Sequence, residues 1–360
     1  MVKIIQIFFL FILTTYYTNG QEIIVGAEQT DKYFSSLKNK RVGIICNQTS
    51  NIKSVHIVDS MLLAKINIVA IFAPEHGFRG DADAGEHIQN NTDSITGIPI
   101  ISLYGKNKKP KKKDLEKIDI LVFDIQDVGA RFYTYISTLH YIIESCSENN
   151  VELLILDRPN PNGHYVDGPL LENKFKSFVG MHPIPITHGM TIGEYAKMIC
   201  GENWVKNSKD NTPKIIMIKN YKREMHYELP IKPSPNLPNS RAINLYPSLC
   251  LFEGTNVSVG RGTDHPFQHI GAPYFQNSYS FTPKSGTGSK YPKYEDEKCF
   301  GTDLRSQDRY LREIDLSWLI DAYNNCPNKN SFFNSFFDKL AGTDKLRKQI
   351  IAGKTEREIK

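Results

Sequence analysis

Residues 67–86 read NIVAIFAPEHGFRGDADAGE, an apolar run that leads directly into a charged loop. Its first six residues are mostly apolar on successive positions, as expected for a β-strand that is covered on both faces. A loop dense in charged groups and glycines follows at once. A turn needs glycine but not a glutamate, a histidine, an arginine and three further acids. We therefore interpret the loop as an active site at the end of a strand; the alternative is a solvated loop.

The same succession of apolar run, polar loop and helical stretch recurs between residues 41 and 220. Helical spacing marks residues 54–65 and 134–150, and residues 190–200 open with Thr191 three positions before Glu194, a capping box. Alternating strands and helices predict an α/β fold, with a Rossmann-like, doubly wound and mostly parallel sheet. The expected strands are residues 41–46, 67–72, 98–104, 118–125, 151–157, 182–187 and 214–219.

The pattern changes near residue 230. Residues 229–248 are rich in Pro and Asn and lack any helical or strand period, which predicts a long crossing segment. The remainder mixes aromatic loops with one or two helices, such as residues 315–326. We expect three parts: a signal peptide (1–20), a Rossmann-like catalytic domain (21–230) and a second, smaller α+β C-terminal domain (231–360) that completes a cleft.

The N-terminus has the three-part layout of a secretory signal peptide. Lys3 precedes an apolar run over residues 4–13, and a polar stretch ends at Gly20. The apolar run is too short to span a bilayer comfortably. We expect an exported protein, periplasmic or secreted, with no stable membrane anchor after signal cleavage.

Charge and cysteine usage exclude several classes of function. A formal net charge of +5 over 360 residues is too mild to indicate nucleic acid as a partner. The basic run over residues 106–117 contains Pro and is followed by acids, so we interpret it as a solvated loop that leads into a helix. The six cysteines are widely spaced without a C-x-x-C pair, which predicts no metal site, and several read as small buried hydrophobic residues.

The common cofactor and nucleophile signatures are absent. The sequence has no G-x-G-x-x-G after the first strand, no P-loop, no H-E-x-x-H and no G-x-S-x-G. We therefore expect no cofactor. Carboxylates in strand-end loops remain. Glu75 is the foremost, because Pro74 before it fixes one backbone angle and Gly77 after it lets the chain turn sharply; the alternative is that Glu75 caps a turn. Paired carboxylates with aromatic walls are typical of glycoside hydrolysis.

Seven long motifs carry a resemblance to a known family. In order, they are APEHGFRGDADAGE, VFDIQDVGARFYTYISTLHY, LDRPNPNG, VDGP, HGMTIGEYA, KPSPNLPN and YPSLCLFEGTNVSVGRGT. Together they resemble the bacterial exo-β-N-acetylmuramidases over roughly residues 41–305. The resemblance implies two domains around a cleft, and hydrolysis that releases N-acetylmuramic acid from the non-reducing end of peptidoglycan fragments. Family members usually continue further at the C-terminus, so we expect the end of the C-terminal domain to be shortened.

The resemblance also assigns roles to residues. It implies that Glu75 is the catalytic acid/base, and we expect Asp127 or Glu253 as the second catalytic group, with assistance by the substrate's 2-acetamido group as an alternative. Muramyl saccharides are the expected partner, and their lactyl carboxylate requires an arginine. The expected substrate-binding residues are His76, Arg79, Arg131, Tyr133, Asp157, Asn160, His188 and Arg261. Two other functions stay open: a non-catalytic, two-lobed sugar-binding protein, and an esterase or amidase acting on the same polymer.

Overall fold

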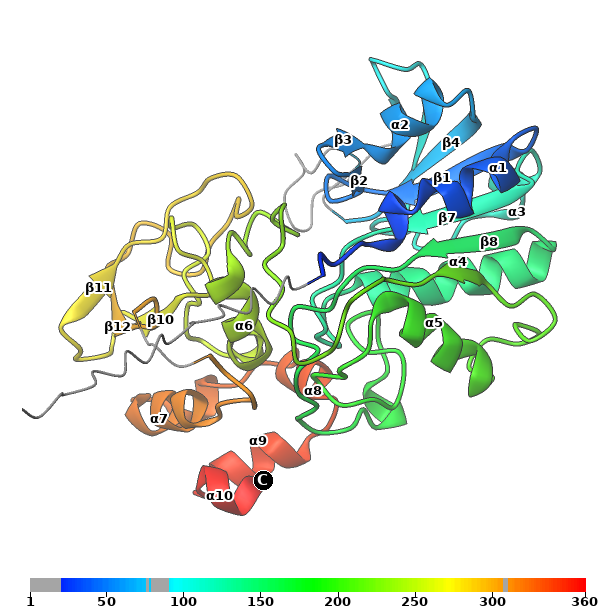
Figure 1. Cartoon of the computed structure of the whole chain (residues 1–360). Helices are drawn as coiled ribbons and strands as arrows, with labels where there is room; N and C mark the ends of the chain where they lie inside the picture. Colours follow the sequence, from blue (N-terminus) through cyan, green and yellow to red (C-terminus); the bar gives the residue numbers. More distant parts are fainter. Residues whose placement is uncertain (1–20, 76–77, 79–90, 307–309) are drawn as a thin grey trace, which may run out of the picture.

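The computed structural model describes residues 21–75, 78, 91–306 and 310–360 (Figure 1). A seven-stranded sheet forms the centre of the N-terminal domain, in the order β5-β6-β4-β1-β7-β8-β9. Every neighbouring pair is parallel except β5 and β6. The strands are β1 (Arg41–Cys46), β4 (Asn67–Ala73), β5 (Asn91–Thr92), β6 (Pro99–Ser102), β7 (Ile120–Asp124), β8 (Glu152–Leu156) and β9 (Lys214–Ile216). This topology confirms the predicted doubly wound fold class.

Alternate residues of the central strands face two separate apolar layers. On one face, Leu121 and Phe123 of β7 join a cluster with α4 (Tyr135–Asn149) and α5 (Ile192–Gly201). On the other face, Val122 joins a cluster with α1 (Phe34–Leu37) and α2 (Ile57–Leu63). Both faces are covered, which is why β7 is buried at every position and reads as a continuous apolar run.

Helices α4 and α5 lie where the sequence predicts them. In α4 the apolar face is buried, and the helix ends at Asn150, which adopts the left-handed conformation with φ of 53°. In α5 the capping box is present: the Thr191 hydroxyl accepts from the Glu194 amide while the Glu194 carboxylate accepts from the Thr191 amide. Short elements complete this domain: η1 (Gly26–Glu28), η2 (Thr30–Lys32), β2 (Asn51–Ile52), β3 (Val55–His56), α3 (Lys112–Leu115) and η3 (Asn173–Phe175).

The strand expected at residues 182–187 is wrong. Two prolines in this segment, Pro183 and Pro185, lack the N–H that a sheet requires. Only isolated bridges form here, from Thr187 to Ala130 and to Asp167. The His188 loop that follows therefore does not extend from a strand of the sheet.

The C-terminal domain is smaller and contains a three-stranded antiparallel sheet in the order β10-β12-β11. It confirms the predicted α+β class. Figure 1 places this sheet on the opposite side of α6 from the N-terminal domain. The elements are α6 (Ser240–Leu249), η4 (Cys250–Gly254), β10 (His269–Ala272), β11 (Tyr279–Phe281), β12 (Cys299–Asp303), α7 (Ser317–Asn325), η5 (Lys329–Ser331), α8 (Phe337–Ala341), α9 (Lys345–Ile351) and α10 (Glu356–Ile359).

Helix α6 corrects the expectation of an irregular crossing segment over residues 229–248. The side chain of Asn239 accepts a hydrogen bond from the amide of Ala242 and so caps the N-terminus of the helix. Pro247 lies inside the helix near its C-terminal end. The prolines around it conceal the helical period, whereas the Asn-Ser start is the local signal for the helix.

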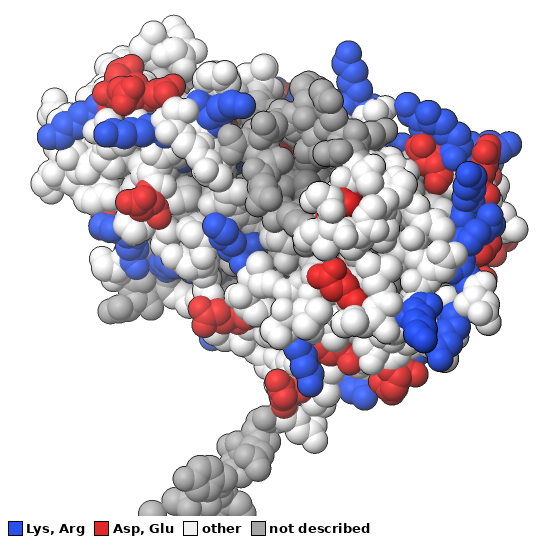
Figure 2. All heavy atoms as spheres, turned by 90° about the horizontal axis from the view of Figure 1, so that it is seen from above, with Lys and Arg blue, Asp and Glu red and all other residues white. Residues whose placement is uncertain are grey.

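Three general properties bear on function. All six cysteines are buried, as expected for small hydrophobic residues. No helix in the described part of the chain combines the length and the apolar character needed to cross a bilayer. On the face seen in Figure 2, the Lys and Arg side chains of the described residues are interspersed with Asp and Glu side chains, so neither sign of charge dominates among them.

Candidate active site

A cavity of about 140 Å³ lies where the two domains meet. The N-terminal domain contributes Glu75, which follows β4, and residues 132–135, which lead into α4. The C-terminal domain contributes residues of α6 and η4, together with Arg261 and Phe267. The site thus forms at the carboxyl ends of β4 and β7, where ligands bind in doubly wound sheets.

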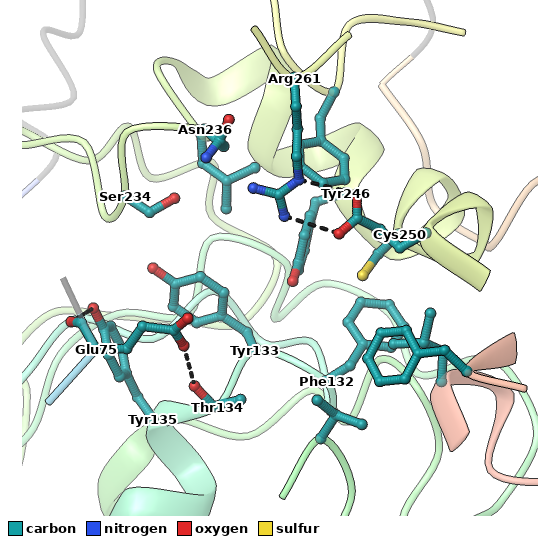
Figure 3. A pocket seen from close by; sticks show the side chains of 16 residues that line it. Glu75, Phe132, Tyr133, Thr134, Tyr135, Ser234, Asn236, Tyr246, Cys250 and Arg261 are labelled. Carbon is teal, nitrogen blue, oxygen red and sulfur yellow. Dashed lines mark hydrogen bonds and ion pairs between the residues drawn. The ribbon is translucent and has the colours of Figure 1, made fainter. Parts of the chain in front are cut away.

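Glu75 is half-buried and faces this cavity (Figure 3). Its Oε2 accepts a hydrogen bond from the Thr134 hydroxyl at 3.1 Å. The Tyr135 hydroxyl donates to the Glu75 main-chain carbonyl at 3.4 Å. Thr134 directly precedes α4 and Tyr135 is its first residue. The rigid start of this helix therefore fixes the direction of the Glu75 carboxylate. A carboxylate held in this way is suited to proton transfer.

Glu253 and Arg261 form a bidentate ion pair on the other side of the cavity. Nε of Arg261 donates to Oε1 of Glu253 at 2.9 Å, and Nη2 donates to Oε2 at 3.1 Å. Burial works against the charge of Arg261, but the Glu253 carboxylate outweighs it and raises the pKa of the guanidinium above its ordinary value. The guanidinium also lies over the Phe267 ring, 4.9 Å from its centroid. Arg261 therefore presents a fixed positive charge to the cavity.

Aromatic side chains form the wall between these two groups. Tyr246 contacts Phe132 and Tyr133 edge-to-face, with ring centroids 5.3 and 5.9 Å away. The Tyr133 hydroxyl donates to the carbonyl of Pro233 at 2.9 Å, which ties residues 232–238 to the N-terminal domain. Burial raises the pKa of Tyr133 well above its usual range, so the phenol stays neutral. The wall is apolar and suited to a sugar ring.

Asp127 does not line the cavity. It is buried, and its Oδ2 accepts from the Gly129 amide at 2.6 Å, while its Oδ1 has no hydrogen-bond partner among the described residues. Burial raises the pKa of Asp127 to about 7 despite the amides of Gly129 and Val128. The loop after β7 therefore turns this carboxyl group inward, where it holds a backbone turn.

His188 lies beside Asp127, with Nε2 3.9 Å from Oδ2. Burial lowers the pKa of His188 to about 3, so the ring is neutral at physiological pH. Its Nδ1 accepts from the Met190 amide at 3.3 Å, which assigns the proton to Nε2. His188 is buried and is not part of the cavity wall.

Arg131 is fully buried and its guanidinium is occupied by the main chain. Nη1 donates to the carbonyls of Pro169 and Ile184 at 2.7 and 2.6 Å. Nη2 donates to the carbonyls of Leu340 and Ala341 in α8, at 3.0 and 2.7 Å. Arg131 therefore joins the two domains, a position that does not favour direct contact with substrate.

Asp157 and Asn160, after β8, are also engaged in loop structure. Asp157 accepts from the Gly193 amide at 2.8 Å and from the Thr191 hydroxyl at 2.9 Å, and burial raises its pKa to about 6. Asn160 donates to the Met190 carbonyl at 2.9 Å. Neither residue lines the cavity.

The structure thus brings together four of the predicted site residues: Glu75, Tyr133, Glu253 and Arg261. His76 and Arg79 lie outside the described residues. Sequence reasoning assigned no role to several other lining residues, namely Thr134, Tyr135, Ser234, Asn236 and Tyr246. All of them lie within the long motifs quoted above, in the stretches FYTY, KPSPNLPN and YPSL. Membership of these motifs was the available signal in the sequence. Among the described residues, no three His, Cys, Asp or Glu side chains are placed to hold a metal ion.

Comparisons with known proteins agree with this architecture. Two solved structures of DUF1343 family proteins from Bacteroides fragilis are similar to the chain. One is 49% identical with a TM-score of 0.87, covering 94% of this chain and 93% of that one. The other is 29% identical with a TM-score of 0.78, covering 91% of each.

The sequence comparisons identify the family. A "Peptidoglycan beta-N-acetylmuramidase NamZ" of Bacillus subtilis is 40% identical over 352 residues, which cover 89% of this chain and 82% of the relative. The family model for the N-terminal part of the exo-β-N-acetylmuramidase NamZ matches residues 42–241, and the model for its C-terminal part matches residues 244–360. The chain therefore belongs to the NamZ family of exo-β-N-acetylmuramidases, which are glycosidases.

Proposed function

We propose that the protein hydrolyses peptidoglycan fragments from their non-reducing end and releases N-acetylmuramic acid, with Glu75 as the catalytic acid/base. The observation that carries the proposal is the cavity between the domains, where Glu75 faces the fixed charge of Arg261 across an aromatic wall. Family membership supports a glycosidase over a non-catalytic sugar-binding protein.

Arg261 is the residue we assign to the lactyl carboxylate of N-acetylmuramic acid. Its Nε and Nη2 donate to Glu253, while Nη1 has no hydrogen-bond partner among the described residues. Carboxylate recognition by a planar guanidinium fits this geometry. Of the other two candidate arginines, Arg131 donates to main-chain carbonyls through both Nη1 and Nη2, and Arg79 lies outside the described residues.

The arrangement favours substrate assistance over a carboxylate nucleophile. Both oxygens of Glu253 are engaged by Arg261, and Asp127 is buried away from the cavity with a pKa raised to about 7. In this mechanism the oxygen of the 2-acetamido group attacks the anomeric carbon while Glu75 protonates the departing glycosidic oxygen. Glu75 then removes a proton from the water that opens the resulting oxazolinium ring, and the product retains its anomeric configuration.

A defined disaccharide of N-acetylmuramic acid β-linked to N-acetylglucosamine tests the activity. We expect mass spectrometry to detect the two monosaccharides, with a new reducing end on N-acetylmuramic acid. An esterase or amidase would leave the glycosidic bond intact. A sugar-binding protein would bind the disaccharide without turnover. Either result would overturn the proposed function.

We further propose that residues 1–20 direct export to the periplasm or the exterior. The support is the charged start, short apolar run and polar end of this segment, and peptidoglycan lies outside the cytoplasm. N-terminal sequencing of the protein recovered from the expressing bacterium tests this proposal: a mature chain that begins near Gln21 supports export, and an uncleaved chain retained in the cytoplasm contradicts it.

A further inference from the structure

A second hollow adjoins the cavity and has no role in the site described above. It has a volume of about 580 Å³ and belongs entirely to the C-terminal domain. We call it the outer pocket; its lining residues lie within the segments 235–238, 262–269 and 279–287. Gly262, in the second of these segments, directly follows Arg261 of the active-site cavity.

One tight turn separates the two hollows. Leu237 donates its amide to the Ser234 carbonyl at 3.1 Å, and these two residues face the active-site cavity. Pro235 and Pro238 line the outer pocket, whereas Asn236 lines both. Asn236 is fixed because its Nδ2 donates to the Gly288 carbonyl at 2.6 Å. The turn at residues 234–237, which we call the threshold, is therefore a rigid boundary between the cavity and the outer pocket.

The position of Glu75 relates this threshold to the reaction. Figure 3 shows Glu75, Ser234 and Asn236 on one side of the cavity, with Phe132 and Cys250 on the other. A general acid lies next to the bond that it protonates. The leaving group of a sugar bound in the cavity therefore departs on the Glu75 side, toward the threshold and the outer pocket.

The chemistry of the outer pocket suits a saccharide. His269 stacks on Phe281, with ring centroids 4.0 Å apart, and its Nδ1 lies 2.8 Å from the Tyr279 hydroxyl. Its Nε2 donates to the Thr263 hydroxyl at 3.1 Å, because that hydroxyl already donates to the Gly260 carbonyl. Tyr279 and Phe281 are thus held in place and remain half-exposed, as a wall against which a sugar ring can pack.

Exposed polar groups surround this aromatic wall. Thr282 and Thr287 supply hydroxyls, and Asp264 and Lys284 supply one charge of each sign. Such a balanced set of donors and acceptors matches the hydroxyl and acetamido groups of a neutral amino sugar. A stem peptide with several carboxylates would require more positive charge than Lys284 alone provides.

We propose that the outer pocket binds the N-acetylglucosamine residue on the leaving-group side of the scissile bond. The proposal rests on the proposed function, because it requires N-acetylmuramic acid to occupy the active-site cavity. With this site, the enzyme selects its substrate by the saccharide leaving group as well as by the terminal sugar. Cleavage of glycan fragments then gains from binding energy that a small artificial leaving group does not supply.

Filling the outer pocket tests the proposal. We compare Thr287→Trp and Thr282→Trp with Ser35→Trp, a control at an exposed hydroxyl residue of α1 in the other domain. The substrates are 4-nitrophenyl N-acetylmuramide and the peptide-free disaccharide. We expect kcat/KM for the disaccharide to fall about tenfold or more in both pocket variants. Turnover of the nitrophenyl substrate, which also reports correct folding, should change less than about threefold, and the control should match the wild type.

Three results would overturn the assignment: unchanged cleavage of the disaccharide, an equal loss on both substrates, or a loss seen only when the disaccharide carries a stem peptide. The last result would assign the pocket to peptide instead. A wild-type enzyme inactive on both substrates would refute the proposed function itself, which distinguishes that failure from failure of the outer-pocket assignment.

Discussion

The loops after β4 and β7 begin at the same edge of one sheet, yet they place their carboxylates in opposite environments. Glu75, after β4, is half-buried, faces the cavity and accepts a hydrogen bond from Thr134. Asp127, after β7, is buried, and one of its oxygens accepts from the Gly129 amide. A strand-end position therefore brings a residue near the site, whereas local backbone partners decide whether its side chain reaches the substrate.

Exchanging the two carboxylates for amides gives the largest expected contrast. Glu75→Gln should lower kcat for the muramyl disaccharide about 10²–10⁴-fold, the usual contribution of a general acid/base. Asp127→Asn should keep at least about a tenth of the activity, because its carboxyl group lies outside the cavity wall. Released N-acetylmuramic acid is quantified for both variants, with circular dichroism as the folding control. Equal losses would restore Asp127 as the second catalytic group.

The second prediction tests whether the loop after β7 is a structural joint. Arg131→Met removes the donors of four main-chain carbonyls, two of them in α8. Unsatisfied buried acceptors are costly, so we expect the free energy of unfolding to fall by about 3–5 kcal/mol. Denaturant unfolding measures this loss. Arg131→Lys serves as the matched control, since it keeps the charge and should lose less. A Met variant as stable as the wild type would contradict the assignment.

The third prediction concerns the positive charge opposite Glu75. Arg261→Lys keeps a charge but loses the planar pair of donors that holds Glu253. We expect KM for the nitrophenyl muramide to rise about 10–100-fold. The same variant should lose little on a glucosaminide without the lactyl group, on which wild-type turnover is already weak. A parallel loss on both substrates would remove Arg261 from lactyl recognition.

The smallest effect is a pH-dependent gain in stability for Asp127→Asn. The folded protein raises the pKa of Asp127 from 3.8 to about 7, so between these pH values it binds a proton that the unfolded chain releases. The wild type therefore loses stability from this group as the pH rises from about 4 to about 7. Removing the group should raise the free energy of unfolding at pH 8, where the unfavourable contribution of the ionised carboxyl group is fully present, and change it little at pH 4.

His188 gives this pH experiment an internal check. Its folded pKa is lowered from 6.5 to about 3, so its contribution has the opposite sign and rises with pH over that interval. Thermal unfolding of the wild type and of Asp127→Asn across pH 4–8 isolates the contribution of the Asp127 carboxyl group to stability, because both proteins contain His188. A gain that does not depend on pH would contradict a buried, protonatable Asp127.

The strand pattern predicted the sheet and its two covered faces because periodicity records burial directly. It did not predict the fate of individual polar side chains in the loops. Arg131 and Asp157 look like ligands in sequence, but their partners are main-chain groups from distant segments, such as the carbonyl of Ala341 and the amide of Gly193. Spacing along the chain carries no information about such partners, since they are set by tertiary packing.

Two errors in secondary structure have the same origin. In two proline-rich stretches the sequence pattern wrongly predicted a strand at residues 182–187 and an irregular segment in place of α6. The apolar pattern alone does not reveal whether backbone donors are available. The cavity wall was also incomplete from sequence, since Thr134 and Asn236 belong to motifs whose residues carry no recognisable chemistry until the two domains are placed together.

If Glu75 protonates the leaving group, the loss of activity on replacing Glu75 must depend on how much the leaving group needs a proton. We would measure kcat/KM of Glu75→Gln and the wild type on the muramyl disaccharide and on a dinitrophenyl muramide, whose leaving group needs no proton. We expect kcat/KM to fall about 10²–10⁴-fold on the disaccharide and less than about tenfold on the dinitrophenyl substrate. Equal losses on the two substrates, or retained activity on the disaccharide, would contradict this role of Glu75.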